Sequence, residues 1–459
     1  MYKNTIGTSP ENSEKISDRM EQVAFNSIRK ALPDSAIRKI CKDIGYKYRD
    51  RMITPIIIVL HMIMSAIWPE ESFNASWQVL WTTLVSWFPC LKGRSPSRGT
   101  VSNARARLPF EFWKRLFKFI SRQAQDLSGQ YDRWRGHRVV LLDGTCISMP
   151  GNLELFEEFG TATGFHGECN YPPARLVTLC IANTMMVLDY ALGRYDQDEN
   201  SLARPLLKKL RKSDLLLADR HFAAAHFYFY YKSIGLEFLT KAHQRLKISR
   251  IKPIKSYSRN DFIGWLKINK NYRREKPELP ARIMVRFIKA SLRSRGERKA
   301  VWLVTSLLDN KLYPACEIVH LYGKRWRIET LFREVKINFS ADVLRSKTAQ
   351  GVRKEITSRL IAINLVRTIM LEAAIANGAE PIRISFIHAV RAIISFSPAL
   401  ASEPLWKLLP IYQAMLSEIA SHVVPERLGR NEPRMVTRER KHYPKLKITR
   451  DQWRKKNAA

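Results

Sequence analysis

The segment between residues 137 and 242 alternates short apolar runs with helical patterns, and no other feature constrains the fold as strongly. Three strand-like runs come first, HRVVLLDGTCIS, ARLVTLCIA and MMVLDYALG. A helix (residues 199–214), a fourth strand (LLLADRHF), a second helix (residues 223–235) and a fifth strand (LEFLTKA) follow. Such an order favours a mixed sheet with helices packed on its faces. The sequence therefore predicts an α/β fold.

Two aspartates stand where buried strand runs end. Asp143 follows VVLL, and Asp219 follows LLLA. An unpaired carboxylate is costly to bury inside a strand, whereas strand ends open onto the crevice where α/β proteins place their sites. Taken alone, each aspartate more often caps a strand end than binds a ligand. Both are therefore candidate site residues whose role depends on a third group.

The third group lies in the helical segment LYGKRWRIETLFREVK (residues 321–336). At about 100° per residue, Tyr322, Arg325, Glu329 and Lys336 fall within an arc of about 60° on one helix. Apolar residues fill the neighbouring arc, which is the natural core-facing side. Two interpretations remain open. A solvated amphipathic helix explains the charges, and an active-site edge explains an acid among two cations and a phenol.

The net charge points to a polyanionic partner. The chain has 78 Lys and Arg against 42 Asp and Glu, a formal net charge of +36. This excess destabilises a compact protein through self-repulsion unless a polyanion offsets it. Nucleic acid fits because cations along the whole chain release counterions together, whereas a membrane surface calls for one short polybasic segment. We therefore expect a nucleic acid as partner, which the family resemblance described below narrows to double-stranded DNA, with no membrane and no small-molecule substrate.

The remaining composition predicts a cytoplasmic, nucleoid-associated protein. The polar N-terminus has no apolar signal core. The apolar run at residues 52–68 is short and interrupted, so it predicts a buried helix rather than a membrane span. Six cysteines show neither C-x-x-C pairs nor zinc spacing, so they are interpreted as reduced thiols.

Shifts of pattern along the chain predict five regions. Residues 1–135 form a helical DNA-binding domain, in which two basic helices (residues 95–125) carry Arg105 and Arg107 as candidate DNA contacts. An ordinary basic helical hairpin is the alternative for these helices. The other predicted regions are the first part of the core (136–245), a β insertion (246–311), the second part of the core (312–400), and a C-terminal region with a cationic arm from Pro425 (401–459).

The three carboxylates predict a metal centre if the helix packs on the sheet edge. Asp143, Asp219 and Glu329 could not stay close and ionised without a cation, and oxygen-rich sites select Mg²⁺ or Mn²⁺. Two such ions activate a water or hydroxyl and stabilise the leaving oxygen in phosphoryl displacement. With the net positive charge, the acids predict a metal-dependent nuclease-like enzyme that uses Mg²⁺, with Mn²⁺ as a substitute.

The same residues resemble a known family. YGKRWRIETLFREVK resembles the Tyr-x2-Arg-x3-Glu-x6-Lys pattern of bacterial DDE transposases of the insertion-sequence-four family. LLDGT and ADRHF resemble that family's two Asp regions, and KAVWLVTSLLDNKLYPACEIVHLYGKRWRIE resembles its lead-in to the Glu helix. The resemblance covers roughly residues 95–445. It implies a ribonuclease-H-like core with an inserted β unit, an N-terminal domain that binds element ends, and a homodimer on paired ends.

The resemblance also implies roles for individual residues. Asp143, Asp219 and Glu329 would hold the metals, and Tyr322, Arg325 and Lys336 would bind terminal phosphates and the strand end. Arg220, beside Asp219, is a further candidate DNA contact. Two departures stand out: His221 replaces a residue that is often small, and Trp302 lies near but not clearly at the position of a base-stacking Trp. For Trp302, core packing is the alternative.

The predicted activity is transposition of an insertion sequence. The protein is expected to bind its terminal inverted repeats, cleave at the element ends and join the 3′ ends to target DNA. One alternative is a metal-dependent nuclease that does not join DNA. The other is a domesticated DNA-binding protein without catalysis, against which the intact acids argue.

Overall fold

The computed structural model describes residues 32–49, 52–67, 72–87, 95–161, 163–164, 167–168, 171–294, 297–338, 344–402 and 405–425. The cationic arm expected from Pro425 lies almost wholly outside these residues.

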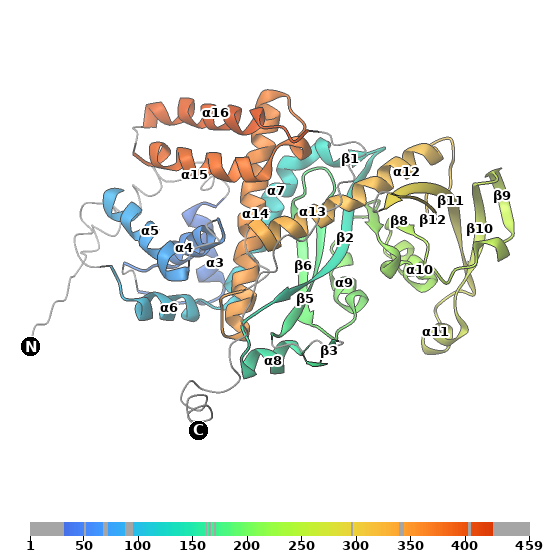
Figure 1. Cartoon of the computed structure of the whole chain (residues 1–459), viewed down its shortest axis with the longest axis horizontal. Coiled ribbons are helices and arrows are strands. Elements are labelled where there is room, and N and C mark those ends of the chain that lie inside the picture. Colours follow the sequence, from blue (N-terminus) through green and yellow to red (C-terminus); the bar gives the residue numbers. More distant parts are fainter. Residues whose placement is uncertain are drawn as a thin grey trace, which may run out of the picture.

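One ten-stranded mixed sheet runs through the molecule (Figure 1), in the order β6-β5-β2-β7-β8-β12-β11-β10-β9, with β1 paired to β2. The strands are β1 (Arg133–Trp134), β2 (His137–Ser148), β5 (Pro173–Ile181), β6 (Val187–Arg194), β7 (Leu215–Ala218), β8 (Glu237–Lys241), β9 (Pro253–Ser258), β10 (Asp261–Lys267), β11 (Arg282–Ser294) and β12 (Glu297–Thr305). A separate two-stranded ribbon joins β3 (Thr163–Gly164) and β4 (Gly167–Glu168).

The first five strands of this order have a ribonuclease-H-like topology. β2, β5 and β6 form an antiparallel meander, and β7 and β8 add in parallel on the other side of β2. This topology confirms the predicted fold class. The later strands β9–β12 are all antiparallel, and β12 pairs with β8. They therefore extend the same sheet instead of forming a separate one.

Helices cover both faces of the sheet, as the alternation of side chains along the strands requires. On β2, Val140 and Leu142 pack in one apolar cluster with α9 (Glu199–Leu207) and α10 (Ala225–Ser233). Leu141 packs in the other cluster, with α7 (Phe110–Ser128), α13 (Arg327–Arg333) and α14 (Ala349–Asn377). The second cluster continues into the helical part of the molecule, which therefore shares one core with the sheet.

The helical part surrounds α14 (Figure 1). Thr348 caps the start of α14 by accepting a hydrogen bond from the Gly351 N–H, and Gly378 ends it with φ 64°. Asn364 exchanges two hydrogen bonds with the Val187 backbone, at 2.8 and 2.9 Å, which ties α14 to β6. The remaining helices are α3 (Asp34–Asp43), α4 (Pro55–Ile67), α5 (Phe73–Trp87), α6 (Arg98–Arg107), α8 (Leu153–Phe159), α11 (Lys270–Glu275), α12 (Ala315–Gly323), α15 (Phe386–Ser402) and α16 (Leu405–Ser421).

Two apolar helices are relevant to whether the chain could span a membrane. The run predicted to be a buried helix forms α4, in which every residue is buried. Among the described residues, α14 is the one helix long and apolar enough to cross a membrane, but 78% of its most apolar window is buried inside the protein. Core helices of this kind pass the same test, so α14 is weak evidence for a span.

Two helical predictions differ from the structure. The helix expected at residues 199–214 ends at Leu207, and the chain then turns through Ser213 at φ 67°. The segment 321–336 is not one α-helix. The end of α12 passes through a 3₁₀ turn (Lys324–Trp326) into α13, which a π turn (Glu334–Asn338) continues. The π turn begins at Glu334, whose carboxylate is buried in an ion pair with Arg367 of α14 at 2.6 Å.

A buried arginine joins strands β9–β12 to the rest of the fold. The fully buried Arg286 on β11 donates to both oxygens of Asp261 on β10, at 2.7 and 2.6 Å. Its guanidinium also donates to the Tyr313 carbonyl at 2.7 Å and to Asn310 at 2.8 Å, in the segment that leads to α12. One side chain thus connects two strands with the chain that enters the Glu329 helix.

We expect Arg286→Ala to lower the free energy of unfolding by about 3–5 kcal/mol, because Asp261 would stay buried without its partner. Chemical denaturation followed by circular dichroism measures this loss. Lys289→Ala, at an exposed position of the same strand, is the control and should change the free energy by no more than about 0.5 kcal/mol. Equal losses in the two variants would contradict the role assigned to Arg286.

Candidate active site

The register of the two parallel strands places the predicted aspartates side by side. On β2 and β7, Leu142 pairs with Ala218. Asp143 and Asp219 are the residues that follow this pair, so they lie side by side on the same face of the sheet. Asp219 stands at the end of β7 as predicted, but β2 continues past Asp143 to Ser148, so Asp143 is not at a strand end. The Asp219 carboxylate also accepts a hydrogen bond from the His221 N–H at 2.7 Å, which shapes the turn after β7.

Arg325 brings the third acid to this edge. Its guanidinium lies 3.3 Å from a carboxylate oxygen of Asp143 and 3.2 Å from one of Glu329. The Arg325 side chain is only 8% exposed, whereas Glu329 is 49% exposed and faces outward. A buried cation thus sits between two acids that come from distant parts of the chain.

The electrostatics of Asp143 reflect its crowded, buried position. Burial raises the pKa of Asp143 to about 6. The Gly144 N–H and the positive charge of Arg325 act against this rise in the Asp143 pKa, while the negative charges of Asp219 and Glu199 add to it. Desolvation is thus the main cause of the raised Asp143 pKa, and each of the neighbouring acids adds less to it than Arg325 removes.

Glu199 is a fourth acid beside this edge that the sequence patterns did not single out. It begins α9 and pairs with Arg175 of β5 at 2.6 Å. A Cβ atom on Gly144 would lie 2.7 Å from the Glu199 carboxyl carbon, so the carboxylate packs directly on the β2 backbone next to Asp143. The acidic start of a helix directly after a strand was the available signal.

Tyr322 and Lys336 also lie near the edge. The buried Tyr322 hydroxyl donates to the Ala218 carbonyl at 3.4 Å, and burial raises its pKa. Lys336 follows in the π turn and is half-buried. Burial raises the pKa of the Cys146 thiol on β2, and the charges of Arg175 and Lys336 act against that rise. Lys336 therefore lies within electrostatic reach of the strand that carries Asp143.

Trp302 and Arg220 have different surroundings. Trp302 belongs to the apolar cluster on the opposite face of the sheet and meets the Phe262 ring edge-on at 5.8 Å. This position favours the core-packing interpretation that the sequence left open. The exposed Arg220 donates to Gln244 at 3.2 Å beside the end of β7.

Arg105 and Arg107 lie on α6, away from the acids. The Arg105 guanidinium stacks on the Phe73 ring at 3.7 Å, and burial lowers its pKa to about 10. It lines a cavity of about 610 Å³ that also holds Arg345, Lys347 and Lys354. Arg107 is exposed. The structure thus gathers Asp143, Asp219, Glu329, Tyr322 and Arg325 at one place and leaves α6 as a separate cationic region.

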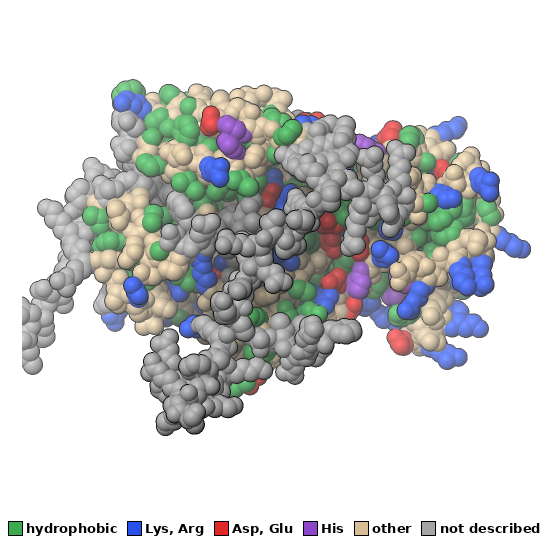
Figure 2. Space-filling view, viewed as in Figure 1, with side chains coloured by type: hydrophobic (Ala, Val, Ile, Leu, Met, Phe, Trp, Pro, Cys, Tyr) green, Lys and Arg blue, Asp and Glu red, His purple; other side chains and the backbone are tan. Residues whose placement is uncertain are grey.

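Acidic and basic side chains also lie in different places on the molecular surface. Figure 2 shows Asp and Glu side chains near the middle of the viewed face, and Lys and Arg side chains over the end that carries β9–β12. Exposed cations at that end include Lys255, Arg259, Lys267, Lys270, Arg274, Lys276 and Arg282. A polyanion that crossed this face would meet the acids between cationic regions.

Comparisons with known proteins agree with this geometry. The family model described as a transposase DDE domain matches residues 134–365, which is half of the chain and contains all three acids. The chain belongs to this family, and it is therefore a DDE transposase, an enzyme that cleaves and transfers DNA strands and depends on a divalent metal.

A particular relative is the transposase InsG for the insertion sequence element IS4 of Escherichia coli (strain K12). The two are 25% identical over 367 residues, which cover 77% of this chain and 80% of the relative. Among solved structures, a piggyBac transposase synaptic complex with hairpin DNA matches with a TM-score of 0.41 and 12% identity, over 88% of this chain and 85% of that one. The family assignment confirms the resemblance found in the sequence.

The raised pKa of Asp143 predicts a pH-dependent gain in stability on its removal. The folded chain keeps the Asp143 proton up to about pH 6, against an ordinary value of 3.8. Ionisation therefore costs folding free energy as the pH rises through this window, by about 3 kcal/mol above it. In EDTA, we expect Asp143→Asn to raise the melting temperature at pH 8 but not at pH 4.

The control for this experiment is Asp309→Asn. Asp309 is exposed, and hydrogen bonds from the Leu312 and Lys311 N–H groups lower its pKa. Its removal should stabilise the protein at neither pH. A gain for Asp143→Asn of equal size at both pH values would mean that charge is not the cause.

Proposed function

We propose that this transposase binds the terminal inverted repeats of its own insertion sequence, cleaves at the element ends and joins the 3′ ends to target DNA. The observation that carries the proposal is that Asp143 lies beside Asp219 in the strand register and is joined to Glu329 through Arg325. Asp143 lies within β2, which continues to Ser148, whereas Asp219 directly follows β7, so these carboxylates and that of Glu329 meet only through the tertiary fold. A solvated helix face, the alternative for segment 321–336, does not account for a buried arginine bonded to Asp143.

The three acids are the proposed metal ligands, with Mg²⁺ as the natural ion and Mn²⁺ as a substitute. The donor set fits, because all three side chains offer the hard oxygen ligands that these ions prefer. A pair of such ions would activate water or a 3′ hydroxyl and stabilise the leaving oxygen. The chain's own task is then to place the scissile phosphate, since phosphoryl transfer depends mainly on position and charge.

Phosphate placement is assigned to the cations of the Glu329 helix. Arg325 has a planar fork that suits bidentate phosphate binding, and Lys336 provides a compact point charge. The Tyr322 hydroxyl donates a hydrogen bond to the Ala218 carbonyl, next to Asp219. We assign general DNA contacts to the exposed Arg220 and Arg107, and to the cationic cavity that Arg105 lines. Trp302 is left out, because it packs on Phe262.

The larger assignments follow from the same proposal. Residues 1–135 are the proposed end-recognition domain, residues 136–245 and 312–400 the catalytic core, residues 246–311 its insertion, and residues 401–459 the C-terminal region with its DNA-binding arm. Two copies would hold a pair of element ends, in the cytoplasm. A related nuclease that hydrolyses DNA without joining remains the second candidate, because the same acids serve both reactions.

The proposed function is tested with full-length protein, DNA that carries the element ends, a plasmid target and Mg²⁺. Joined products are expected for the wild type, and hydrolysis without joining would select the nuclease. Asp143→Asn and Asp219→Asn should each abolish cleavage while end binding persists, because a negative charge near phosphate is removed. Asp126→Asn, at an exposed position of α7, should keep full activity. Cleavage within about tenfold of wild type, or about 1.4 kcal/mol of barrier, would remove that aspartate from the ligand set.

The Glu329 helix predicts two different failures. Glu329→Ala should lose chemistry and keep the complex with paired ends, whereas Lys336→Ala should weaken DNA placement. Loss of one charge-assisted contact costs about 1.5–3 kcal/mol, or about ten- to a hundred-fold in end binding. Mn²⁺ should partly restore cleavage by Glu329→Asp and should restore Lys336→Ala little. Gel-shift and cleavage assays measure both effects.

Arg333→Ala is the matched control, because Arg333 lies exposed on the same helix. It should resemble wild type in both assays. If Glu329→Ala and Lys336→Ala behave alike in binding, cleavage and metal response, the four-residue stripe of this helix has no divided role.

A further inference from the structure

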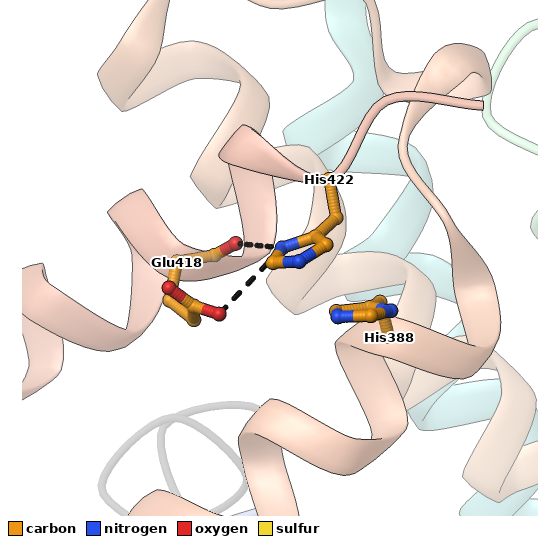
Figure 3. Close-up of side chains that lie close together, drawn as sticks. All are labelled: His388, Glu418 and His422. Carbon is orange, nitrogen blue, oxygen red and sulfur yellow. Dashed lines mark hydrogen bonds and ion pairs between the residues drawn. The ribbon is translucent and has the colours of Figure 1, made fainter. Parts of the chain in front are cut away.

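A second group of metal-ligating side chains lies on the C-terminal helices. His388 on α15, Glu418 on α16 and His422 just after α16 place their ligand atoms within 4.8 Å of one another. Figure 3 shows the two imidazole rings face to face with the Glu418 carboxylate beside His422, and the ring centroids lie 3.4 Å apart. None of these residues takes part in the site around Asp143.

The backbone holds the two histidines in this arrangement. The Ser385 N–H donates to the His422 carbonyl at 2.9 Å, and the Val424 N–H donates to the Arg383 carbonyl at 2.7 Å. An isolated β-bridge pairs Ile384 with Val423 between them. The start of α15 and the end of α16 are thus joined directly beside the cluster. The lone pairs of imidazole lie in the ring plane, and the two stacked planes differ by 20°, so both rings reach one ion after a side-chain rotation, without a change of backbone.

The surroundings of His422 prepare one of its nitrogens for a ligand. Its Nδ1 lies 3.1 Å from the Glu418 carbonyl oxygen, which can only accept, so the proton is assigned to Nδ1. The same nitrogen lies 3.0 Å from the Ser421 hydroxyl oxygen and 3.6 Å from a Glu418 carboxylate oxygen, so the carboxylate must turn from Nδ1 toward Nε2 to share an ion with His422. This leaves the lone pair on Nε2. A histidine that donates one ring N–H to a backbone carbonyl and offers the other nitrogen is the usual arrangement of a metal ligand. Glu418 and His422 are four residues apart, on one side of the last helical turn.

The chemistry of the cluster selects the ion. Two neutral imidazoles and one carboxylate suit Zn²⁺, whereas Mg²⁺ prefers oxygen ligands and keeps its waters. The Glu418 side chain is 49% exposed and that of His422 is 37% exposed, so a further coordination position is open to water. We propose that His388, Glu418 and His422 bind one Zn²⁺ ion, which fastens the start of α15 to the end of α16.

The role of this ion is structural. α14 lies between the α15–α16 pair and the sheet in Figure 1, so the ion would not reach the acids. A cross-link between residue 388 and residues 418–422 closes the hairpin of α15 and α16 at its open end. A metal that binds only the folded chain stabilises it by mass action. Zn²⁺ should therefore raise the melting temperature, and the rise should grow with the concentration of free Zn²⁺.

The test uses full-length, metal-stripped protein that carries Asp143→Asn and Asp219→Asn, so that the acid site does not take up Zn²⁺. Equilibrium dialysis with Zn²⁺ in excess Mg²⁺ should find one ion per chain. Loss of a hydrogen-bond partner of a metal ligand lowers metal affinity by about 10–100-fold. His388→Gln and His422→Gln each remove a ligand itself, so each should lower the affinity for Zn²⁺ by more than that. Co²⁺ in place of Zn²⁺ should give visible absorption without thiolate charge-transfer bands, which excludes the cysteines.

Two comparisons make the result decisive. His320→Ala removes an exposed histidine elsewhere and should bind Zn²⁺ as the parent does. In EDTA, the two Gln variants should melt as the parent does, and only the parent should gain stability from Zn²⁺. If the parent and both Gln variants bind Zn²⁺ equally, or if none binds it, the cluster is a histidine stack only and the proposal is wrong.

Discussion

The parallel pairing of β2 with β7 is the constraint on which the catalytic edge depends. It places Asp143 beside Asp219 because Leu142 and Ala218 are partners in the strand register. A shift by one residue would turn one carboxylate to the opposite face of the sheet. Parallel neighbours need a long crossover, and here the meander β5–β6 and helix α9 provide it. The same crossover places Glu199 against Gly144. The parallel pairing of β2 with β7 therefore determines the positions of Asp143, Asp219 and Glu199.

Arg325 makes this concentration of acids compatible with folding. Two like charges about 4 Å apart repel by about 4 kcal/mol at the effective dielectric near a protein surface. The buried guanidinium offsets that repulsion by bonding to both Asp143 and Glu329. The charge of Arg325 also acts against the rise that burial causes in the Asp143 pKa. On the proposed function, metal ions would take over the neutralising role, and the Arg325 fork would be available for phosphate.

The sequence predicted the core strands, both aspartates and the acid of the helix, because each depends on a local pattern. An apolar strand run that ends on Asp needs no knowledge of its neighbours. Three features depended on distant contacts, so the sequence missed two of them and left the third open. Glu199 reaches the edge only after α9 packs on the sheet. Arg105, in a basic helix, stacks on Phe73 of another helix. Trp302 could be assigned to a face of the sheet only from the register of β12.

The segment 321–336 matched the family pattern, although the single regular α-helix predicted for it was wrong. A regular period of about 100° per residue placed Lys336 on the stripe with Glu329, but the π turn changes that period beyond Arg333. The π turn begins at the buried ion pair between Glu334 and Arg367 of α14. Since Asn364 fixes α14 to β6, the position of Lys336 relative to Asp143 is set through α14 and the sheet. The spacing between Glu329 and Lys336 thus suits a helix that a tertiary contact has distorted, and an ideal helix would place Lys336 wrongly.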